Sequence, residues 1–225
     1  MLAKKYRSRV VSIKNPFDGI YTVEFESLSG RFKYYPGQFL HVAIDSDYDG
    51  SGQWPESRCF SMQSNPDEPT IRITFSVKGR FTKILQETLM TGSEVWLKLP
   101  YGDLFTQDHS KLNTVFIAGG TGITPFLSLF ASESFSEYVN PSVYLGFKSK
   151  SYNFYNDELK VRNTCDLRIY YEDIEGLINI GQVFSKHGTD STYFISGPPV
   201  MIKAFRQSLI DSGVPVKQVL TDAWE

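Results

Sequence analysis

Apolar and polar residues alternate through much of the first half of the chain. Residues 21–26 read Tyr-Thr-Val-Glu-Phe-Glu, and residues 71–77 read Ile-Arg-Ile-Thr-Phe-Ser-Val. A period of two residues is typical of strands with one buried face. Further strands are predicted at residues 10–13, 39–44, 59–62 and 95–99, and one helix at 82–90. The pattern predicts an antiparallel β-barrel in this half.

The pattern changes near residue 108, where short apolar runs begin to alternate with helical stretches. The apolar runs cover residues 115–118, 143–147, 167–171 and 193–195, and helices are predicted at 124–130 and 199–210. Buried strands that alternate with helices indicate a parallel sheet. The predicted fold class is therefore α+β with two domains, an antiparallel Greek-key β-barrel over residues 1–108 and an α/β parallel-sheet domain over 109–225.

Composition and charge exclude several classes of protein. The 225 residues carry 23 Lys and Arg against 25 Asp and Glu, so the net charge is −2 and a nucleic-acid partner is not expected. The two cysteines cannot ligate an iron–sulfur cluster by themselves, and the three histidines lie far apart, so no metal site is predicted. No apolar run approaches the ~18 residues of a membrane span. A cytoplasmic protein is expected, at a membrane only if the chain is part of a larger protein.

The strongest local motif is the glycine-rich segment 118–125, Ala-Gly-Gly-Thr-Gly-Ile-Thr-Pro, which follows an apolar strand and opens a helix. Glycines let backbone N–H groups approach a pyrophosphate, whose charge the helix N-terminus favours. A tight strand-to-helix turn is the structural alternative. Three glycines and a proline exceed what such a turn needs, so we predict a nucleotide site.

Three further segments carry weaker signals. Residues 78–82, Lys-Gly-Arg-Phe-Thr, open the helix of the barrel half, with Thr82 as a cap or phosphate ligand. Residues 58–61, Arg-Cys-Phe-Ser, place a guanidinium, a ring and a hydroxyl on one strand. Residues 196–201, Ser-Gly-Pro-Pro-Val-Met, lie where open α/β sheets bind ligands. Each alone also fits an ordinary turn, strand or helix start.

Together these segments resemble the ferredoxin–NADP reductase family of flavoenzymes. The resemblance spans nearly the whole chain and rests on motifs in the family's order: Pro36-Gly37-Gln38-Phe39, Arg58-Cys59-Phe60-Ser61, Gly79-Arg80-Phe81-Thr82, Gly119 to Pro125 and Gly197-Pro198-Pro199. It implies an FAD-binding barrel, a domain that binds NADPH or NADH, and a cleft where the two cofactors meet.

The resemblance also implies roles for individual residues. Arg58 would bind the flavin phosphates, Phe60 would lie against the isoalloxazine, and Ser61 would bond near flavin N5. By the same analogy Trp224 would cover the open flavin face, so Ser61, Ser196 and Trp224 are the expected catalytic residues. The remaining FAD contacts would be Cys59, Val77, Lys78, Gly79, Phe81 and Thr82. The nicotinamide nucleotide contacts would be Gly120, Thr121, Gly122, Thr124, Pro125, Lys148, Ser149, Lys150, Gly197, Pro198 and Met201.

Three departures from the family pattern bear on these roles. Phe60 stands where the family often has Tyr, a change that should be tolerated. Ser196 stands where it often has Cys, which is expected to slow hydride transfer. No iron–sulfur or haem domain is attached, so the final acceptor is open.

The loop at residues 148–152, Lys-Ser-Lys-Ser-Tyr, bears on the choice of donor. Two ammonium groups and two hydroxyls suit a 2′-phosphate, whereas an acidic residue would favour a free 2′-hydroxyl. NADPH is therefore favoured slightly over NADH. Lysines on a loop are often merely solvated, and Glu172-Asp173 after the next strand weakens the argument.

The sequence thus predicts an FAD-dependent NAD(P)H oxidoreductase. It would pass hydride to FAD and then electrons to an external acceptor, such as a ferredoxin, a flavodoxin, an oxygenase component or a haem domain. One alternative is an excised dehydrogenase domain of a membrane NADPH oxidase or ferric reductase. A second is a regulatory subunit that binds flavin or nucleotide without turnover.

Overall fold

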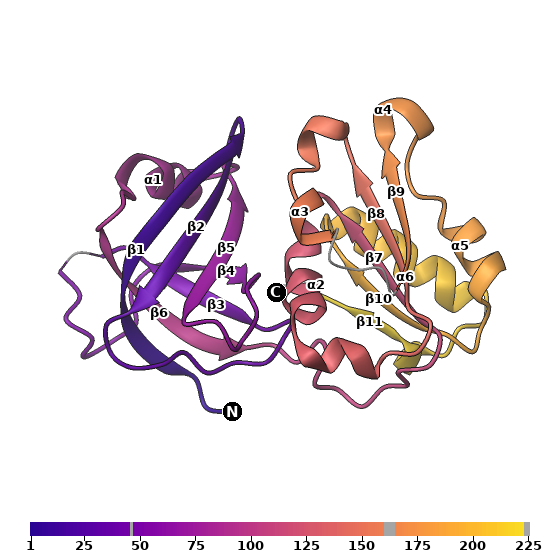
Figure 1. Cartoon of the computed structure of the whole chain (residues 1–225), viewed down its shortest axis with the longest axis horizontal. Coiled ribbons are helices and arrows are strands. Elements are labelled where there is room, and N and C mark those ends of the chain that lie inside the picture. The colour runs from indigo at the N-terminus through magenta and orange to yellow at the C-terminus, as the bar shows by residue number, and fades with distance from the viewer. Residues whose placement is uncertain (46, 160–164, 223–225) are drawn as a thin grey trace. The chain divides into compact units, whose positions relative to one another are not determined.

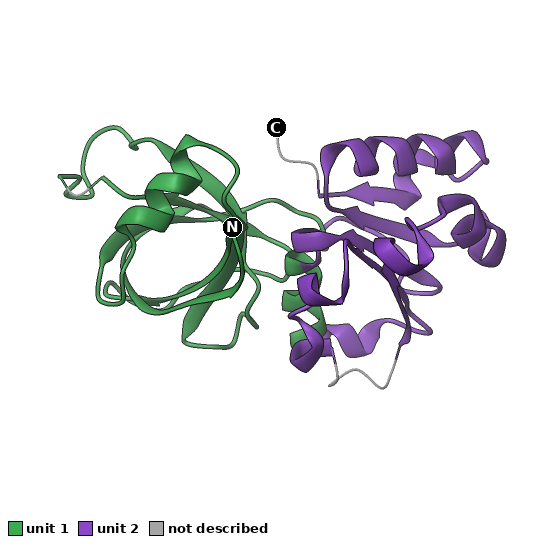
Figure 2. Ribbon diagram, turned by 90° about the horizontal axis from the view of Figure 1, so that it is seen from above, with its two compact units in different colours: residues 1–105, 124–132 green, residues 106–123, 133–225 purple. Residues whose placement is uncertain are grey.

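The computed structural model describes residues 1–45, 47–159 and 165–222. The chain divides into two compact units (Figure 2). Unit 1 comprises residues 1–105 and 124–132, and unit 2 comprises residues 106–123 and 133–225. The predicted boundary between residues 108 and 109 lies close to the first crossing between the units. The segment 124–132, which follows the glycine-rich turn, nevertheless groups with unit 1.

Unit 1 is built on a six-stranded antiparallel sheet with the barrel-like arrangement that the alternating pattern predicts (Figure 1). The strand order is β4-β3-β6-β1-β2-β5. The strands are β1 (Lys4–Phe17), β2 (Ile20–Ser27), β3 (Phe39–Ala43), β4 (Ser57–Ser61), β5 (Thr70–Ser76) and β6 (Glu94–Tyr101). Strand β1 is much longer than the predicted segment 10–13, because it pairs with β6 near its start and with β2 near its end.

One face of these strands builds the core of unit 1. Val23, Phe25, Ile71 and Ile73, on alternating positions of β2 and β5, are at most 1% exposed. Of the polar residues between them, Thr22 and Arg72 are partly exposed, whereas Thr74 is buried and its hydroxyl lies 3.0 Å from that of Thr22. The alternation read from the sequence therefore matches the division between core and surface at most of these positions, with Thr74 as an exception.

The helix of the barrel half, α1, covers Arg80–Thr88. Its N-cap is Gly79, so the helix begins two residues before the predicted start at Thr82. Thr82 is the third helical residue and supports the cap from inside the helix. Phe81 and Leu85 are the buried residues of α1 and join the core of unit 1.

Unit 2 contains a five-stranded parallel sheet with the order β11-β10-β7-β8-β9. The strands are β7 (Thr114–Gly119), β8 (Ser142–Phe147), β9 (Asp166–Tyr171), β10 (Thr192–Ser196) and β11 (Val219–Thr221). The order changes direction between β7 and β10, because the chain moves outward from β7 through β8 to β9 and then returns. The carboxyl ends of strands at such a point are where open α/β sheets bind ligands.

Helices of this half include the two that the sequence predicts and others that it did not. The predicted helices are α2 (Thr124–Ala131) and α6 (Pro199–Asp211), and Gly213 after α6 has a positive φ of 96°. The helices not predicted are α3 (Asn156–Leu159), α4 (Glu172–Glu175) and α5 (Ile180–His187). Short 3-10 turns lie at η1 (Gly120–Ile123), η2 (Glu133–Glu137), η3 (Lys150–Tyr152) and η4 (Val216–Gln218).

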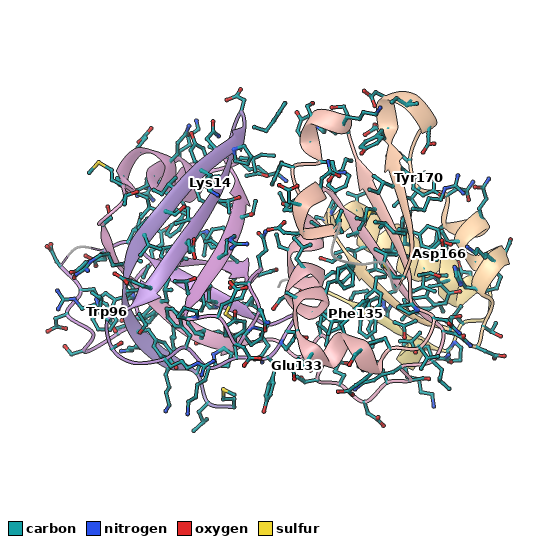
Figure 3. All side chains as sticks on the ribbon, viewed as in Figure 1. Lys14, Trp96, Glu133, Phe135, Asp166 and Tyr170 are labelled. Atoms are coloured by element: carbon teal, nitrogen blue, oxygen red, sulfur yellow. The ribbon has the colours of Figure 1, made fainter. Side chains whose placement is uncertain are left out.

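Aromatic side chains contribute much of the interior of unit 2. Phe116 on β7 stacks on Phe194 of β10 with ring centroids 5.4 Å apart. Phe135, labelled in Figure 3, packs against Phe116 at 6.2 Å. Among the described residues, no helix combines the length and the apolar character needed to cross a membrane.

Candidate functional site

Strand β4 carries the predicted flavin-binding residues of unit 1. Its neighbour β3 pairs Leu40 with Phe60 and Val42 with Arg58. Leu40 and Val42 are fully buried, and Phe60 packs partly against the same core with its ring 5.8 Å from that of Phe75. Ser61, at the end of the strand, is 8% exposed. The strand therefore fixes Phe60 and Ser61 and leaves the Arg58 guanidinium at the surface.

Arg58 lies beside the start of helix α1. Its guanidinium carbon is 5.1 Å from the centroid of the Phe81 ring, and Nη2 is 3.2 Å from a carboxylate oxygen of Glu56. Arg80 lies 3.9 Å from the other oxygen of Glu56. Two guanidinium groups thus share one carboxylate next to the positive end of a helix, and this excess of positive charge suits phosphate oxygens.

The turn that opens α1 is closed by the hydroxyl of Thr82. The N–H groups of Lys78 and Gly79 donate to Thr82 Oγ1 at 3.0 and 3.1 Å, and the hydroxyl donates to the Gly79 carbonyl at 3.0 Å. The Val77 N–H donates to the Gly19 carbonyl. The N–H groups of Arg80, Phe81 and Thr82 have no acceptor within the helix, and the first intrahelical bond is from the Lys83 N–H to the Gly79 carbonyl. These inner N–H groups, rather than those of Val77 to Gly79, are the donors suited to a ligand.

Cys59 points to the opposite face of β4 from Phe60. Its Sγ lies 3.5 Å from His41 Nε2, and His41 Nδ1 is 3.2 Å from Ser57 Oγ. Burial raises the pKa of the Cys59 thiol, although Arg58 acts against this, and burial together with Lys98 lowers the pKa of His41. Both shifts favour neutral groups, so the pair does not form a reactive thiolate.

The glycine-rich turn of unit 2 follows β7 as predicted. It continues through η1 into α2, where Pro125 is the second helical residue. A Cβ added to Gly122 would lie 2.4 Å from Gly197 Cα and 2.5 Å from Gly197 N. Two glycine segments, one after β7 and one after β10, therefore meet backbone to backbone. Gly120 has a φ of 55°, and no atom would lie within 4 Å of an added Cβ.

Met201 and Pro198 pack against the same turn. A Cβ on Gly119 would lie 2.9 Å from Met201 Sδ and 3.0 Å from Pro198 Cδ. Met201 also approaches Gly197, where an added Cβ would be 2.8 Å from Met201 Cε. The structure thus brings the predicted residues after β7 and those after β10 together.

Ser196 has a buried partner that the sequence analysis missed. Its hydroxyl donates to a carboxylate oxygen of Asp222 at 3.2 Å, and the two residues are 2% and 9% exposed. The Asp222 N–H donates to the carbonyl of Ile195, which holds the carboxylate beside the end of β10. The sequence signal that could have identified Asp222 is its position directly after the short strand β11. Trp224 lies outside the described residues, so its expected place over the flavin stays a prediction.

The proposed donor-specificity loop lies after β8. The Lys148 ammonium is 5.8 Å from the centroid of the Tyr152 ring, and the hydroxyls of Ser149 and Ser151 are 2.8 Å apart. Lys148 and Lys150 are exposed. The N–H of Asp173 donates to the Lys148 carbonyl at 3.2 Å, so the acidic segment after β9 lies beside this loop.

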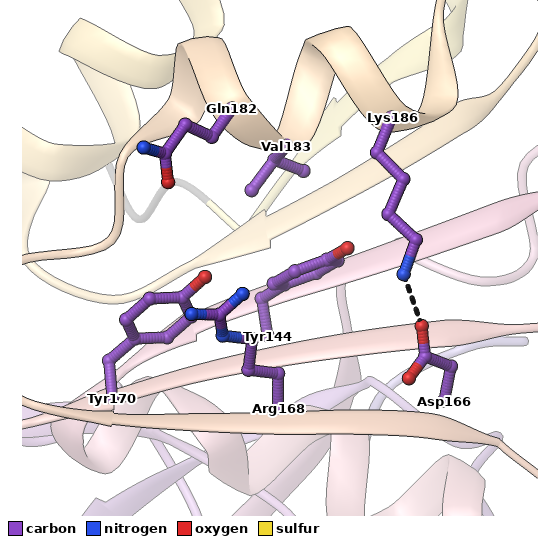
Figure 4. A pocket seen from close by; sticks show the side chains of 7 residues that line it. All are labelled: Tyr144, Asp166, Arg168, Tyr170, Gln182, Val183 and Lys186. Atoms are coloured by element: carbon purple, nitrogen blue, oxygen red, sulfur yellow. Dashed lines mark hydrogen bonds and ion pairs between the residues drawn. The ribbon is translucent and has the colours of Figure 1, made fainter.

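A separate pocket of unit 2 is formed by β8, β9 and α5 (Figure 4). It is lined by Tyr144, Asp166, Arg168, Tyr170, Gln182, Val183 and Lys186, and Lys186 donates to Asp166 across it at 2.5 Å. Asp166 begins β9, whereas the predicted nucleotide contacts follow the carboxyl ends of the strands. Of the predicted site residues that the structure describes, none lines this pocket.

The predicted residues therefore form two groups. The first, at β4 and the start of α1, joins Arg58 to Phe81, while Cys59 faces the other side of the strand. The second, at the carboxyl ends of β7 and β10, joins Gly122, Gly197, Pro198 and Met201. Loop 148–150 follows β8, the neighbour of β7.

Comparison with curated proteins finds relatives among reductases. The chain is 28% identical over 216 residues to the reductase component of propane 2-monooxygenase from Mycolicibacterium smegmatis, covering 87% of this chain and 60% of that protein. It is 26% identical to the sulfhydrogenase 2 subunit gamma of Pyrococcus furiosus, with 94% and 80% covered. No family model matches the chain.

Solved structures share the fold across the whole chain. A ferredoxin NADP+ reductase from Neisseria gonorrhoeae, solved with bound FAD and NADP, matches with a TM-score of 0.82 at 16% identity, covering 97% of this chain and 98% of that one. The ferredoxin reductase in carbazole 1,9a-dioxygenase matches with a TM-score of 0.78 at 20% identity, covering 100% and 70%. The chain therefore has the two-domain fold of the ferredoxin–NADP reductases, and its sequence is similar to those of reductase components of monooxygenases.

Proposed function

We propose that the protein is an FAD-dependent NAD(P)H reductase that delivers electrons to a separate acceptor protein. The observation that carries this proposal is that one chain builds two turns whose geometry suits phosphate groups. One is the start of α1 beside Arg58, and the other is the glycine turn that is closed on Gly197. A dinucleotide flavin and a nicotinamide dinucleotide each need such a turn for their pyrophosphates.

The residues of unit 1 fit FAD. The α1 N-terminus with Arg58 and Arg80 offers positive charge that Glu56 only partly balances. Phe60 is held by its contact with Phe75 and presents a partly exposed ring, and Ser61 offers a hydroxyl one residue further along the strand. Aromatic rings of this kind suit a flat heteroaromatic group, and a hydroxyl suits a ring nitrogen.

The residues of unit 2 fit a nicotinamide nucleotide. Gly122 packs against the backbone of Gly197 and fixes the turn, and at Gly120, where no atom would lie within 4 Å of an added Cβ, the backbone is open to the pyrophosphate of a dinucleotide. Ser196 and the buried Asp222 stand at the end of β10, beside this turn. We assign the nicotinamide end to that side, and the ribose 2′ position to Lys148 and Lys150.

Bound FAD would supply the hydride-accepting and electron-passing chemistry. The chain's own task is binding and orientation. Arg58 and α1 neutralise the flavin pyrophosphate, and Phe60 supports the ring system. The Asp222 carboxylate accepts the Ser196 hydroxyl hydrogen and so orients this hydroxyl. The Ser196 oxygen can then accept a hydrogen bond from a donor such as a carboxamide N–H.

The acceptor is proposed to be a redox protein outside this chain. The relatives named as reductase components belong to oxygenase systems, and this chain spans 60% of the length of the propane 2-monooxygenase relative. A ferredoxin or an oxygenase component is therefore the acceptor class to test first.

The test is an absorbance spectrum of the purified protein, recorded before and after anaerobic addition of NADPH and, separately, NADH. We expect a flavin spectrum in the 450 nm region that bleaches with at least one donor. Extraction and chromatography of the bound flavin identify it as FAD. A protein that takes up no FAD contradicts the proposal, and one that binds FAD but is reduced by neither nucleotide is a binding subunit instead.

A further inference from the structure

Helix α2 is joined to the rest of unit 1 by hydrogen bonds to residues outside the helix. The Ser128 hydroxyl donates to the Ser64 carbonyl at 2.8 Å, and Ser128 is fully buried. A serine inside a helix commonly bonds to a carbonyl of its own preceding turn, so this outward bond is a tertiary contact. One turn later, the Asn65 side-chain N–H donates to the Ala131 carbonyl at 2.9 Å.

The residue that receives α2 is itself firmly held. The Ser64 carbonyl also accepts from the buried Tyr34 hydroxyl at 3.1 Å. The Ser64 hydroxyl donates to the Thr70 carbonyl at 3.2 Å and accepts from the Arg72 N–H at 3.0 Å. Ser64 is therefore fixed from β5 and from Tyr34, and is a rigid attachment point.

Both ends of this connection lie close to the proposed sites along the chain. Ser64 comes three residues after Ser61, the end of β4. Ser128 comes four residues after Thr124, where the glycine turn enters α2. One helical turn, about 5.4 Å along the axis, separates the anchored serine from the start of the nucleotide turn.

We propose that Asn65 and Ser128 are positioning residues for hydride transfer. Within unit 1 they join the helix that begins at the end of the nucleotide turn to the loop that follows the flavin strand, so they fix the end of the helix from which that turn extends. This inference rests on the proposed function. Neither Asn65 nor Ser128 is proposed to contact either cofactor. Their loss therefore impairs alignment and leaves the binding groups in place.

The most selective variant is Asn65→Asp, which keeps the shape and removes the donor to Ala131. Its remaining oxygen can still accept from the Asp67 N–H, as Asn65 Oδ1 does now at 3.1 Å. Ser128→Ala removes the second bond. The control is Ser132→Ala, because the Ser132 hydroxyl bonds to Leu129 within the same segment. For each protein we measure FAD content, NADP+ affinity by titration, and the rate of flavin reduction by stopped flow.

We expect Asn65→Asp and Ser128→Ala to keep FAD and to bind NADP+ within about twofold of the parent. Flavin reduction should slow by about tenfold, because small errors in alignment are costly in hydride transfer. The Ser132→Ala protein should match the parent. Parental reduction rates in both anchor variants, with full FAD, would overturn the inference.

A second measurement does not depend on cofactors. Amide hydrogen exchange over residues 124–131 of the protein without added nucleotide should be faster in both anchor variants than in the parent and the control. Unchanged exchange would show that the two bonds do not hold α2, and would overturn the inference even if the parent is an active reductase. If exchange is faster in the variants but neither NADPH nor NADH reduces the parent, the two bonds do hold α2 and the proposed function is refuted.

Discussion

Arg58 is the residue on which we expect FAD affinity to depend most. Its side chain is 53% exposed and lies between Phe81 and Glu56 beside the α1 N-terminus. A hydrogen bond to a charged group contributes about 1.5–3 kcal/mol. Arg58→Ala should therefore weaken FAD binding by about one to two decades, measured by titrating the deflavinated protein with FAD.

The matched control for this measurement is Arg31→Ala. Arg31 is another exposed arginine of unit 1, with 61% of its side chain accessible and Asp67 as its partner. Its removal should leave FAD affinity at the parental value. Equal affinities of all three proteins would refute the role assigned to Arg58.

Gly122 allows no side chain, because the atoms that a Cβ would meet belong to the backbone of Gly197 and Ser196. Gly122→Ala must push the two segments apart and displace the nucleotide turn. We expect NADP+ binding to fall by at least about tenfold while FAD still binds. In the control Gly181→Ala, an added Cβ would meet only the Asn179 side-chain oxygen, at 3.3 Å. Parental nucleotide affinity in Gly122→Ala would contradict the proposed location of the site.

The choice of donor is predicted to depend on Lys148 and Lys150. Replacing both with Ala should raise the KM for NADPH, since only NADPH carries the 2′-phosphate, and should leave the KM for NADH nearly unchanged. Lys111→Ala is the control, because Lys111 precedes β7 and pairs with Glu137. If both donors weaken together, or neither changes, the loop does not recognise the phosphate.

At the scale of single elements, α1 depends on the Thr82 hydroxyl to close its first turn. Thr82→Val keeps the shape and removes the bonds to Lys78, Gly79 and the Gly79 carbonyl. Loss of such capping costs about 1 kcal/mol, which should lower Tm by about 2–4 °C in a protein of this size. Thr88→Val on the same helix, whose hydroxyl bonds to Ile84, is the control for thermal melts. An unchanged Tm in Thr82→Val would rule out this capping role.

Most strands could be predicted because each has a strong local pattern. The alternation in β2 and β5 matches the division between core and surface at most positions, and the apolar runs of β7, β8 and β10 are buried on both faces. Helix α5 was missed although it has a local signal, since the Asn179 side chain caps it by accepting the Gln182 N–H at 3.1 Å. Ile180, Val183 and Phe184 also lie at helical spacing, a signal that the sequence analysis did not use.

The candidate site could be predicted only where the chemistry is local. The glycines at 119–122 and 197 were recognised by sequence, but their contact with each other is a product of strand order. Asp222 was missed because its partner Ser196 lies 26 residues away. The bond from Asn65 to α2 and the bond from Ser128 to Ser64 could not be predicted for the same reason, because their partners are distant in the sequence.

Two histidines should make the folding stability of the whole molecule depend on pH. Burial lowers the pKa of His41 in unit 1 and of His187 in unit 2, with Lys98 and Lys186 respectively acting in the same direction. The unfolded chain then binds protons near the usual pKa of about 6.5, while the folded protein binds them only at lower pH. Stability should therefore be full above pH 6.5 and decline as the pH falls through the lowered values.

Thermal melts between pH 7.5 and pH 5 test this expectation. The Tm should decrease over that window in the parent. It should decrease less in the double variant with His41→Gln and His187→Gln, because neither replacement titrates. If the Tm of the parent stays constant, or if the Tm of the double variant decreases equally, the role assigned to the two histidines is wrong.

The grouping of residues 124–132 with unit 1 means that the backbone passes between the two units three times, at 105/106, 123/124 and 132/133. One break in the polypeptide therefore cannot yield two self-contained fragments. A gene fragment that ends at residue 108 would encode a barrel without α2, leaving the Ser64 carbonyl and the Phe105 ring without their contacts to Ser128 and Phe126. The complementary fragment would carry α2, whose residues 124–130 are buried in the whole chain, without the contacts that Ser64 and Phe105 make to it. Recombination that exchanges nucleotide halves between reductases must therefore transfer α2 with a matching barrel loop, or the chimera will expose both surfaces and aggregate.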